Sequence, residues 1–302
     1  MPAAPAPEVI DLHSHVIAPD LARYPLAPMG HKQSDWSRER PVDAAGMVQA
    51  MDAAGVSRSV LVQASTCYGY DNRYVQDCAA ANPQRFAGVF AVDIQAADAV
   101  AAIDRWSTAG MVGARVFVAG HTNADRSIRL DAPVADAVWG ALSERGVPVC
   151  VQIRADGLDQ VRSVLERFPR LTVLMDHFAR PDLSGGAPYT AARGLFDLAR
   201  FPNLYFKLTT HNVRECQQGA STPADFVRAV VGAFGAERIG WGSNFPASDG
   251  SLTSLVNEAL HVLSSLGGAD QARILSGTAK ALYPQLLTLP AARQVAPMAV
   301  SA

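Results

Sequence analysis

The chain has 302 residues, of which 49% are hydrophobic and 18% are charged, and its formal net charge is -2. This length fits one barrel-sized domain of roughly 250 residues with short tails. The absence of a basic excess argues against nucleic acid or an anionic membrane surface as a partner, and no segment approaches the roughly 20 apolar residues of a membrane span. We therefore expect a small-molecule ligand.

The predicted elements alternate along the whole chain. Short β-branched runs predict eight strands, at 9–12, 56–62, 87–92, 112–118, 147–153, 171–175, 204–208 and 239–241. Helix-compatible stretches lie between and after them, at 41–54, 72–81, 97–109, 133–145, 158–168, 188–199, 223–234 and 251–266. Gly55, Gly110 and Gly146 close three of these helices.

Eight strands alternating with eight helices predict an α/β fold, a single-domain TIM (β/α)8 barrel. A doubly wound open sheet is the competing architecture, but it usually has fewer strands and a glycine-rich phosphate turn after the first one. We expect a flexible amino terminus at 1–8, the barrel at 9–286 and a mobile tail at 287–302. The long segment 18–40 is interpreted as a lid or pocket wall.

The ends of the chain and its cysteines indicate the compartment. Residues 1–7 lack the charged leader and apolar run of a secretory signal. The four cysteines, Cys67, Cys78, Cys150 and Cys216, contain no CxxC pair, which argues against a disulfide framework and a thiolate zinc site. We expect a cytoplasmic protein that can form a homodimer.

Polar residues follow the predicted strands, where a barrel carries its active site. His13 and His15 lie two residues apart at the end of the first strand, so both imidazoles point the same way. The later strands bring further polar side chains to the same end: Gln63, Arg115, His121, Gln152, Asp176, His177, Lys207, His211 and Asn244. By strand alternation, Asp176 is expected to face away from the site and hold the backbone or Arg180.

Several motifs resemble those of a known family. They are Ile10-Asp11-Leu12-His13-Ser14-His15, Asn72 with Pro83-Gln84-Arg85-Phe86-Ala87-Gly88-Val89, Gly113-Ala114-Arg115, Asp176-His177-Phe178-Ala179-Arg180-Pro181 and Trp241-Gly242-Ser243-Asn244-Phe245-Pro246. In this order they resemble the amidohydrolase superfamily, in its amidohydrolase-2 branch, which contains 2-pyrone-4,6-dicarboxylate lactonase and sugar lactonases. The resemblance implies a hydrolase, and a lactonase within that branch.

The resemblance also bears on metal binding. Metal-dependent relatives add ligands on strands five and eight, where this chain has Gln152 and Asn244. Catalytic zinc generally has at least three protein ligands, and an amide oxygen is a poor one. We therefore expect no required cofactor and no metal site. A Zn²⁺ site formed by His13, His15 and His177 is the alternative.

The resulting hypothesis is water attack on a lactone or related carbonyl held among His13, His15, His177 and Asn244. Asn244 replaces the aspartate that takes a proton in relatives, so it can only orient water or donate a hydrogen bond. The base is then His177, His15 or His211. An imidazolium at the strand-one pair is expected to polarise the carbonyl.

Substrate binding is assigned to a second group of residues. Arg115, with His121, Gln152, Gln63 and His211, is expected to hold an acidic or hydroxylated substrate, because a guanidinium suits bidentate carboxylate recognition. Two other functions remain as alternatives: a metal-assisted amide hydrolase or nonoxidative decarboxylase of the same superfamily, and a noncatalytic small-molecule-binding barrel.

Overall fold

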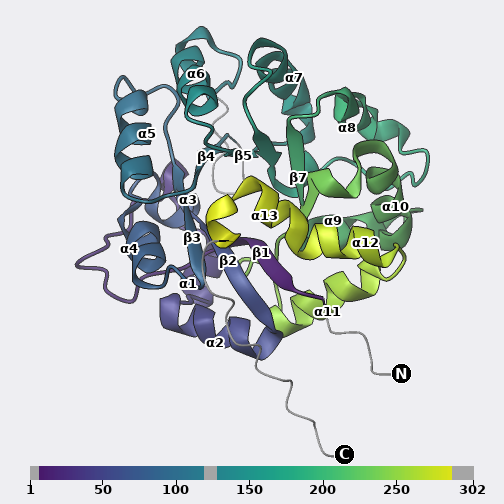
Figure 1. The fold of residues 1–302 in the computed structure, drawn as a ribbon, viewed down its shortest axis with the longest axis horizontal. Helices are drawn as coiled ribbons and strands as arrows, with labels where there is room; N and C mark the ends of the chain where they lie inside the picture. Colours follow the sequence, from purple (N-terminus) through teal and green to yellow (C-terminus); the bar gives the residue numbers. More distant parts are fainter. Residues whose placement is uncertain (1–6, 119–127, 288–302) are drawn as a thin grey trace, which may run out of the picture.

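The strands form a barrel, which Figure 1 shows from the side where the last helix crosses it. The computed structural model describes residues 7–118 and 128–287. Its sheet has eight strands in sequence order, and each consecutive pair is parallel. They are β1 (Val9–Ser14), β2 (Val56–Val62), β3 (Phe86–Ala91), β4 (Gly113–Phe117), β5 (Val149–Gln152), β6 (Val173–Met175), β7 (Leu204–Leu208) and β8 (Ile239–Trp241). The predicted single-domain TIM barrel is confirmed.

The segment after β8 pairs with β1 and closes the barrel. Ser14 forms a parallel bridge with Phe245. The backbone N–H of His15 donates to the carbonyl of Phe245 at 2.9 Å, and that of Asn244 donates to the carbonyl of His13 at 2.7 Å. The backbone bonds that complete the ring are therefore made by three of the residues predicted to act in the site.

A buried carboxylate strengthens this closure. Asp11 Oδ1 accepts from the backbone N–H groups of His13 and Ser243, both at 2.9 Å, and Oδ2 accepts from Ser243 Oγ at 2.5 Å. Gly242 allows the two chain segments to approach, because a Cβ at that position would lie 2.6 Å from the Cβ of His13. Both Asp11 and Gly242 thus fix the position of His13.

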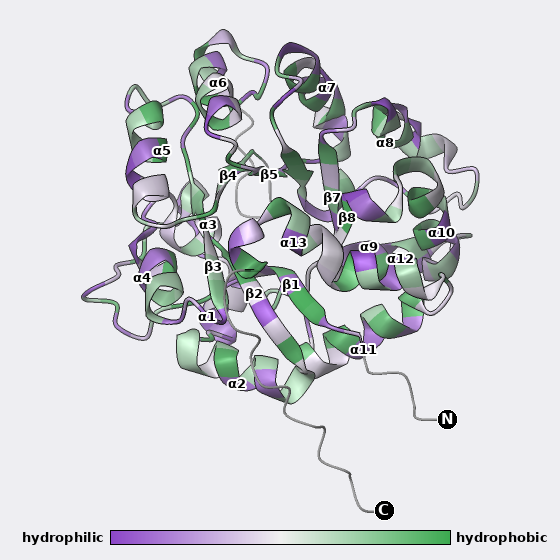
Figure 2. Ribbon diagram, viewed as in Figure 1, coloured by the Kyte–Doolittle hydropathy of each residue, from purple (hydrophilic) through white to green (hydrophobic). Residues whose placement is uncertain are grey.

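Helices surround the ring, and their outer faces are more polar than the strands (Figure 2). Three begin with side-chain caps from Asp43, Thr222 and Ser251. The α-helices are α1 (Asp35–Glu39), α2 (Ala44–Ala54), α3 (Ser65–Tyr68), α4 (Arg73–Ala81), α5 (Ala99–Thr108), α6 (Asp136–Glu144), α7 (Leu158–Arg167), α8 (Arg193–Phe196), α9 (Thr210–Glu215), α10 (Pro223–Phe234), α11 (Leu252–Leu263), α12 (Gly268–Ala272) and α13 (Thr278–Leu282). Within the described ranges, no helix has the length and apolarity needed to cross a membrane.

The structure corrects the prediction of a continuous helix over 188–199. Only α8 is α-helical there, and it lies between the 3-10 turns Thr190–Ala192 and Asp197–Arg200. Tyr189 has a left-handed backbone with φ 58°, which prevents a regular helical start at Pro188. The segment 18–40, predicted as a loop, contains the 3-10 turn Met29–His31 and α1.

The barrel interior has an apolar part and a polar part. Side chains of β1, β2, β3, β5 and β6 pack with α13 and the residue after it in one buried cluster, which includes Ile10, Leu12, Val60, Val62, Val89, Cys150, Leu174, Leu282 and Tyr283. Nearer the carboxyl ends of the strands, His13, Arg115, Asp176 and Lys207 are all buried. Because unpaired buried charges are costly, this polar part must be internally paired.

Candidate active site

A polar cavity of about 130 Å³ opens at the carboxyl ends of the strands. Six of the predicted site residues line it: His15, Arg115, Gln152, His177, His211 and Asn244. Its wall also includes Trp36, Ser65, Arg154 and Arg180. A cavity of this volume suits a compact ligand.

Several polar atoms in this wall have no hydrogen-bond partner among the described residues. They are Ser65 Oγ, Arg115 Nε, Gln152 Oε1 and Arg180 Nε, all buried. Buried polar atoms are normally paired, so a group of unpaired ones around one cavity marks a place for a polar ligand. The residues of the wall carry guanidinium, amide and hydroxyl groups.

Three predicted site residues do not line the cavity in the described structure. Gln63 is corrected from substrate binding to a structural role: its Nε2 donates to the carbonyls of Gly69 and Asp71, at 3.2 and 2.8 Å. Its own carbonyl accepts from Arg115 Nη1 at 2.7 Å, which positions that guanidinium. His13 is fully buried, and its Nε2 lies 3.2 Å from Nε2 of His15, which does line the cavity. His121 lies outside the described residues.

An unusual turn aims His177 at the cavity. β6 ends at Met175, and the four residues from His177 to Arg180 all have left-handed φ values, between 49° and 59°. Left-handed backbone costs roughly 1–2 kcal/mol for each non-glycine residue, so neighbouring contacts must hold the turn. Asn212 Nδ2 does so by donating to the His177 carbonyl at 2.8 Å.

The same asparagine takes part in orienting the His177 ring. His177 Nδ1 lies 2.7 Å from Thr209 Oγ1, which donates to Asn212 Oδ1 at 3.3 Å. Asn212 Oδ1 also accepts from the Thr209 backbone N–H at 3.2 Å. When the Thr209 hydroxyl donates to Asn212 Oδ1, it accepts from His177 Nδ1–H, which puts the imidazole proton on Nδ1 and leaves a lone pair on Nε2.

Sequence reasoning missed Asn212. Thr209 and Asn212 form a capping box at the start of α9, and the spacing Thr209-x-x-Asn212 after a predicted strand is the signal that could have revealed it.

Buried charges lie beneath the cavity. Asp176 Oδ1 is 2.9 Å from Lys207 Nζ, and Asp176 Oδ2 is 3.5 Å from Arg115 Nη2. The expectation that Asp176 faces away and holds Arg180 is wrong, because the strand has ended before it and alternation no longer applies. Arg180 instead pairs with Glu215.

His13, His15 and His177 are neutral at neutral pH. Burial, with Lys207 nearby, lowers the pKa of His13 well below its usual range. Burial and the Arg115 charge lower the pKa of His15 to about 3, and burial also lowers the pKa of His177 well below its ordinary value. The expected imidazolium at the strand-one pair is therefore wrong, because a charged imidazole cannot be solvated there beside two cations.

Asn244 lies at the cavity with a left-handed φ of 56°, a conformation that asparagine tolerates well. Its Nδ2 is 3.3 Å from both His211 Nε2 and Ser248 Oγ. Those two contacts use both amide hydrogens, so the oxygen is the atom that can meet a ligand or water.

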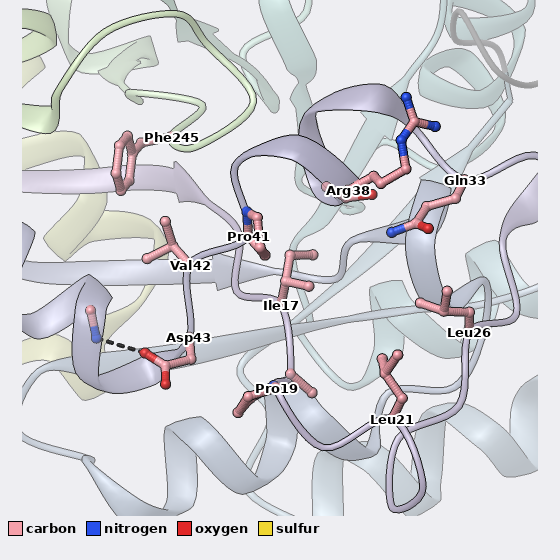
Figure 3. A pocket seen from close by; sticks show the side chains of 13 residues that line it. Ile17, Pro19, Leu21, Leu26, Gln33, Arg38, Pro41, Val42, Asp43 and Phe245 are labelled. Carbon is pink, nitrogen blue, oxygen red and sulfur yellow. Dashed lines mark hydrogen bonds between the residues drawn. The ribbon is translucent and has the colours of Figure 1, made fainter.

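A second, larger cavity lies beside α1, as Figure 3 shows. It has a volume of about 560 Å³ and a mainly apolar wall that includes Ile17, Leu21, Leu26 and Phe245. Trp36 lines the polar cavity, whereas Ser37 and Arg38 of the same helix line the apolar one. The segment 18–40 thus supplies walls to both cavities. Trp36 also stacks on His15, with ring centroids 5.4 Å apart.

The donor set does not fit a catalytic zinc ion. Positions on β5 and after β8 carry the amides Gln152 and Asn244. In the described parts of the chain, no three His, Cys, Asp or Glu side chains are grouped so as to hold a metal. His13 Nε2 and His15 Nε2 face each other at 3.2 Å, each within hydrogen-bond reach of the other.

A closed (β/α)8 barrel with a histidine- and arginine-lined cavity at the carboxyl ends of its strands has the architecture of a barrel enzyme. The amidohydrolase profile (Amidohydro_2) matches residues 10–285, so the chain belongs to the amidohydrolase family. The family expected from the sequence motifs is confirmed.

Three known proteins illustrate the relationship. The chain is 29% identical over 206 residues to an L-fucono-1,5-lactonase of Burkholderia ambifaria, covering 65% of this chain and 67% of that protein. It is 26% identical over 262 residues to a 4-sulfomuconolactone hydrolase of Hydrogenophaga intermedia, covering 82% and 80%. A zinc-bound amidohydrolase structure from Burkholderia multivorans shares the fold, with a TM-score of 0.73, 20% identity and coverage of 94% and 100%.

Proposed function

We propose that the protein is a metal-independent lactonase that hydrolyses a small cyclic ester carrying acidic or hydroxyl groups. Two relatives bear the names of lactone hydrolases. The observation that carries the proposal is the His177 ring: its Nδ1 is held by Thr209, and the cavity contains His177 together with Asn244. This arrangement provides a neutral base beside a group that can orient water.

The unpaired polar atoms support the substrate class. Arg115 and Arg180 each bring a buried Nε–H without a partner among the described residues, and Gln152 brings a buried carbonyl oxygen. Guanidinium groups recognise carboxylates and other oxyanions, and an amide oxygen accepts from a hydroxyl. A lactone with anionic or hydroxyl substituents would form hydrogen bonds with these guanidinium and amide groups.

The reaction follows from these positions. Asn244 Oδ1 accepts a hydrogen bond from water, His177 Nε2 takes a proton from it, and the oxygen adds to the lactone carbonyl. Arg115 and Arg180 stabilise the negative charge of the tetrahedral intermediate. Collapse breaks the ring C–O bond, and His177 returns its proton to the leaving alkoxide, which gives a hydroxy acid.

Hydrolysis of a lactone panel, followed by acid release, tests the proposal. We expect His177→Gln to lower turnover by roughly 10²- to 10⁴-fold, the usual contribution of a positioned base. Asn244→Asp, which keeps an oxygen acceptor, is expected to remain active. Unchanged turnover and an unchanged acid limb in His177→Gln would refute the histidine-base mechanism, and binding without hydrolysis across the panel would favour a noncatalytic barrel.

The cytoplasm is the location we propose, since all four cysteines are free and buried thiols. A homodimer stays a prediction, and sedimentation of the purified protein would test it.

A further inference from the structure

The buried contacts of the strand-one histidines fix where their protons lie. His15 Nδ1 is 2.8 Å from the backbone carbonyl of Val62, which can only accept a hydrogen bond. His15 therefore carries its proton on Nδ1, and because the ring is neutral, its Nε2 has a lone pair. Across the 3.2 Å contact between the two Nε2 atoms, His13 must be the donor.

The opposite end of His13 leads to the same assignment independently. Lys207 Nζ lies 3.0 Å from His13 Nδ1, 2.9 Å from Asp176 Oδ1 and 3.1 Å from Cys150 Sγ. An ammonium group donates and has no lone pair, so His13 Nδ1 must accept. A neutral His13 then holds its only proton on Nε2.

We propose that Lys207 is a positioning residue that locks His13 in the Nε2–H tautomer and so makes the His13–His15 pair unfit to bind a metal. Hydrogen bonds run in one direction, from Lys207 through His13 and His15 to Val62. A zinc ion would need both facing Nε2 lone pairs, but one of these nitrogens carries a proton and the other accepts it.

The position of Asp176 shows what Lys207 prevents. Asp176 Oδ1 is 3.4 Å from His13 Nδ1, close to the place where a carboxylate orients a metal-bound histidine. Without the ammonium group, His13 Nδ1–H could donate to Asp176, and its Nε2 would become a ligand atom. Lys207 Nζ forms an ion pair with Asp176 Oδ1 at 2.9 Å, and its donation to His13 Nδ1 reverses the direction of the bond.

The inference deepens the metal-independent part of the proposed function, and its test needs no substrate. We would label the histidines with ¹⁵N and assign the His13 tautomer in the unaltered protein by long-range ¹H–¹⁵N correlation. The expected result is a protonated Nε2 and an unprotonated Nδ1. A protonated Nδ1 on His13 would overturn the proposal, whatever the outcome of the lactone assays.

Lys207→Met supplies the second arm, since it removes the donor but keeps an extended apolar chain. Carboxylate partners of metal-bound histidines typically change metal affinity by about 10- to 100-fold, so zinc affinity should rise by that factor over the unaltered protein. The gain should disappear in Lys207→Met/His15→Ala, and it should persist in Lys207→Met/His261→Ala, because His261 is on α11 outside the site.

If folded Lys207→Met and the unaltered protein bind zinc with equal affinity, the proposed role of Lys207 is refuted. If Lys207→Met does not fold, the tautomer measured in the unaltered protein decides the question. Loss of lactone turnover in either protein would bear on the proposed function and not on this inference.

Discussion

Replacing Thr209 by valine removes the support of the proposed base, together with the side-chain cap of α9. Valine nearly matches threonine in shape, and Thr209 is buried at 1% exposure, so packing is retained while the hydroxyl is lost. His177 Nδ1 then has no acceptor in place of Oγ1 at 2.7 Å. Because His177 itself is only 4% exposed, water cannot readily replace that partner.

The expected size follows from the cost of an unpaired buried donor, about 1–3 kcal/mol. That cost disfavours the Nδ1–H tautomer, whose Nε2 lone pair is needed for proton abstraction. At about 1.4 kcal/mol per factor of ten, the base-competent form falls by roughly 5- to 150-fold. We expect kcat on a hydrolysed lactone to fall by this factor while KM changes little.

Two variants control this measurement. Thr209→Ser keeps the hydroxyl and should restore most of the activity. Thr210→Val removes the neighbouring hydroxyl, which makes a 3.4 Å contact with the Ser243 carbonyl and none with His177, so kcat should be nearly unchanged. A kcat for folded Thr209→Val within twofold of the unaltered protein, or an equal loss in Thr210→Val, would refute the reasoning.

Three further predictions concern pH and stability. Because burial lowers the pKa of His177, the active, unprotonated form persists on acidification, so the acid limb of kcat/KM should lie below pH 6.5; a limb above that value would contradict the assignment. The pKa values of His13, His15 and His177 are lowered in the folded state, so below about pH 6.5 the unfolded chain binds more protons. The free energy of unfolding should then fall with decreasing pH, by up to about 1.4 kcal/mol per pH unit for each histidine. The raised pKa of Asp11 opposes this fall. Urea titrations that show the same stability at each pH would contradict the prediction. Asp11→Ala leaves three buried donors unpaired and should lower the free energy of unfolding by about 3 kcal/mol or more. Asp159→Ala is the control: its side chain is 88% exposed, so stability should change by less than about 0.5 kcal/mol. Similar urea midpoints for the two variants would argue against the closure role of Asp11.

The sequence predicted the barrel well because its strands are short, β-branched and separated by helices of ordinary length. The predicted bounds of β2, β7 and β8 match the structure, and the others differ by a few residues at their ends. The 188–199 segment failed because composition does not reveal the left-handed backbone of Tyr189. Local propensity is a weak guide where the backbone conformation is set by tertiary contacts.

For the site, strand-end placement brought six predicted residues to one cavity. Alternation failed at Asp176, since it assumes that β6 continues through a residue where the chain has already turned. Gln63 could not be separated from ligand-binding residues by position alone, because only the folded loop shows that its amide serves two carbonyls. The directions of the histidine hydrogen bonds likewise depend on Lys207 and Val62, which are distant from the pair in sequence.

The seam between β1 and the segment after β8 has a consequence for local opening. Its bonds join His13 to Asn244 and His15 to Phe245, so a fluctuation that breaks the seam also releases the backbone of Asn244, which the proposed mechanism uses to orient water. Amide hydrogen exchange at His15 and Asn244 therefore reports how often this side of the site opens. A ligand that bridges His177 and Asn244 would slow exchange at this seam more than at the remote pairing of β3 with β4.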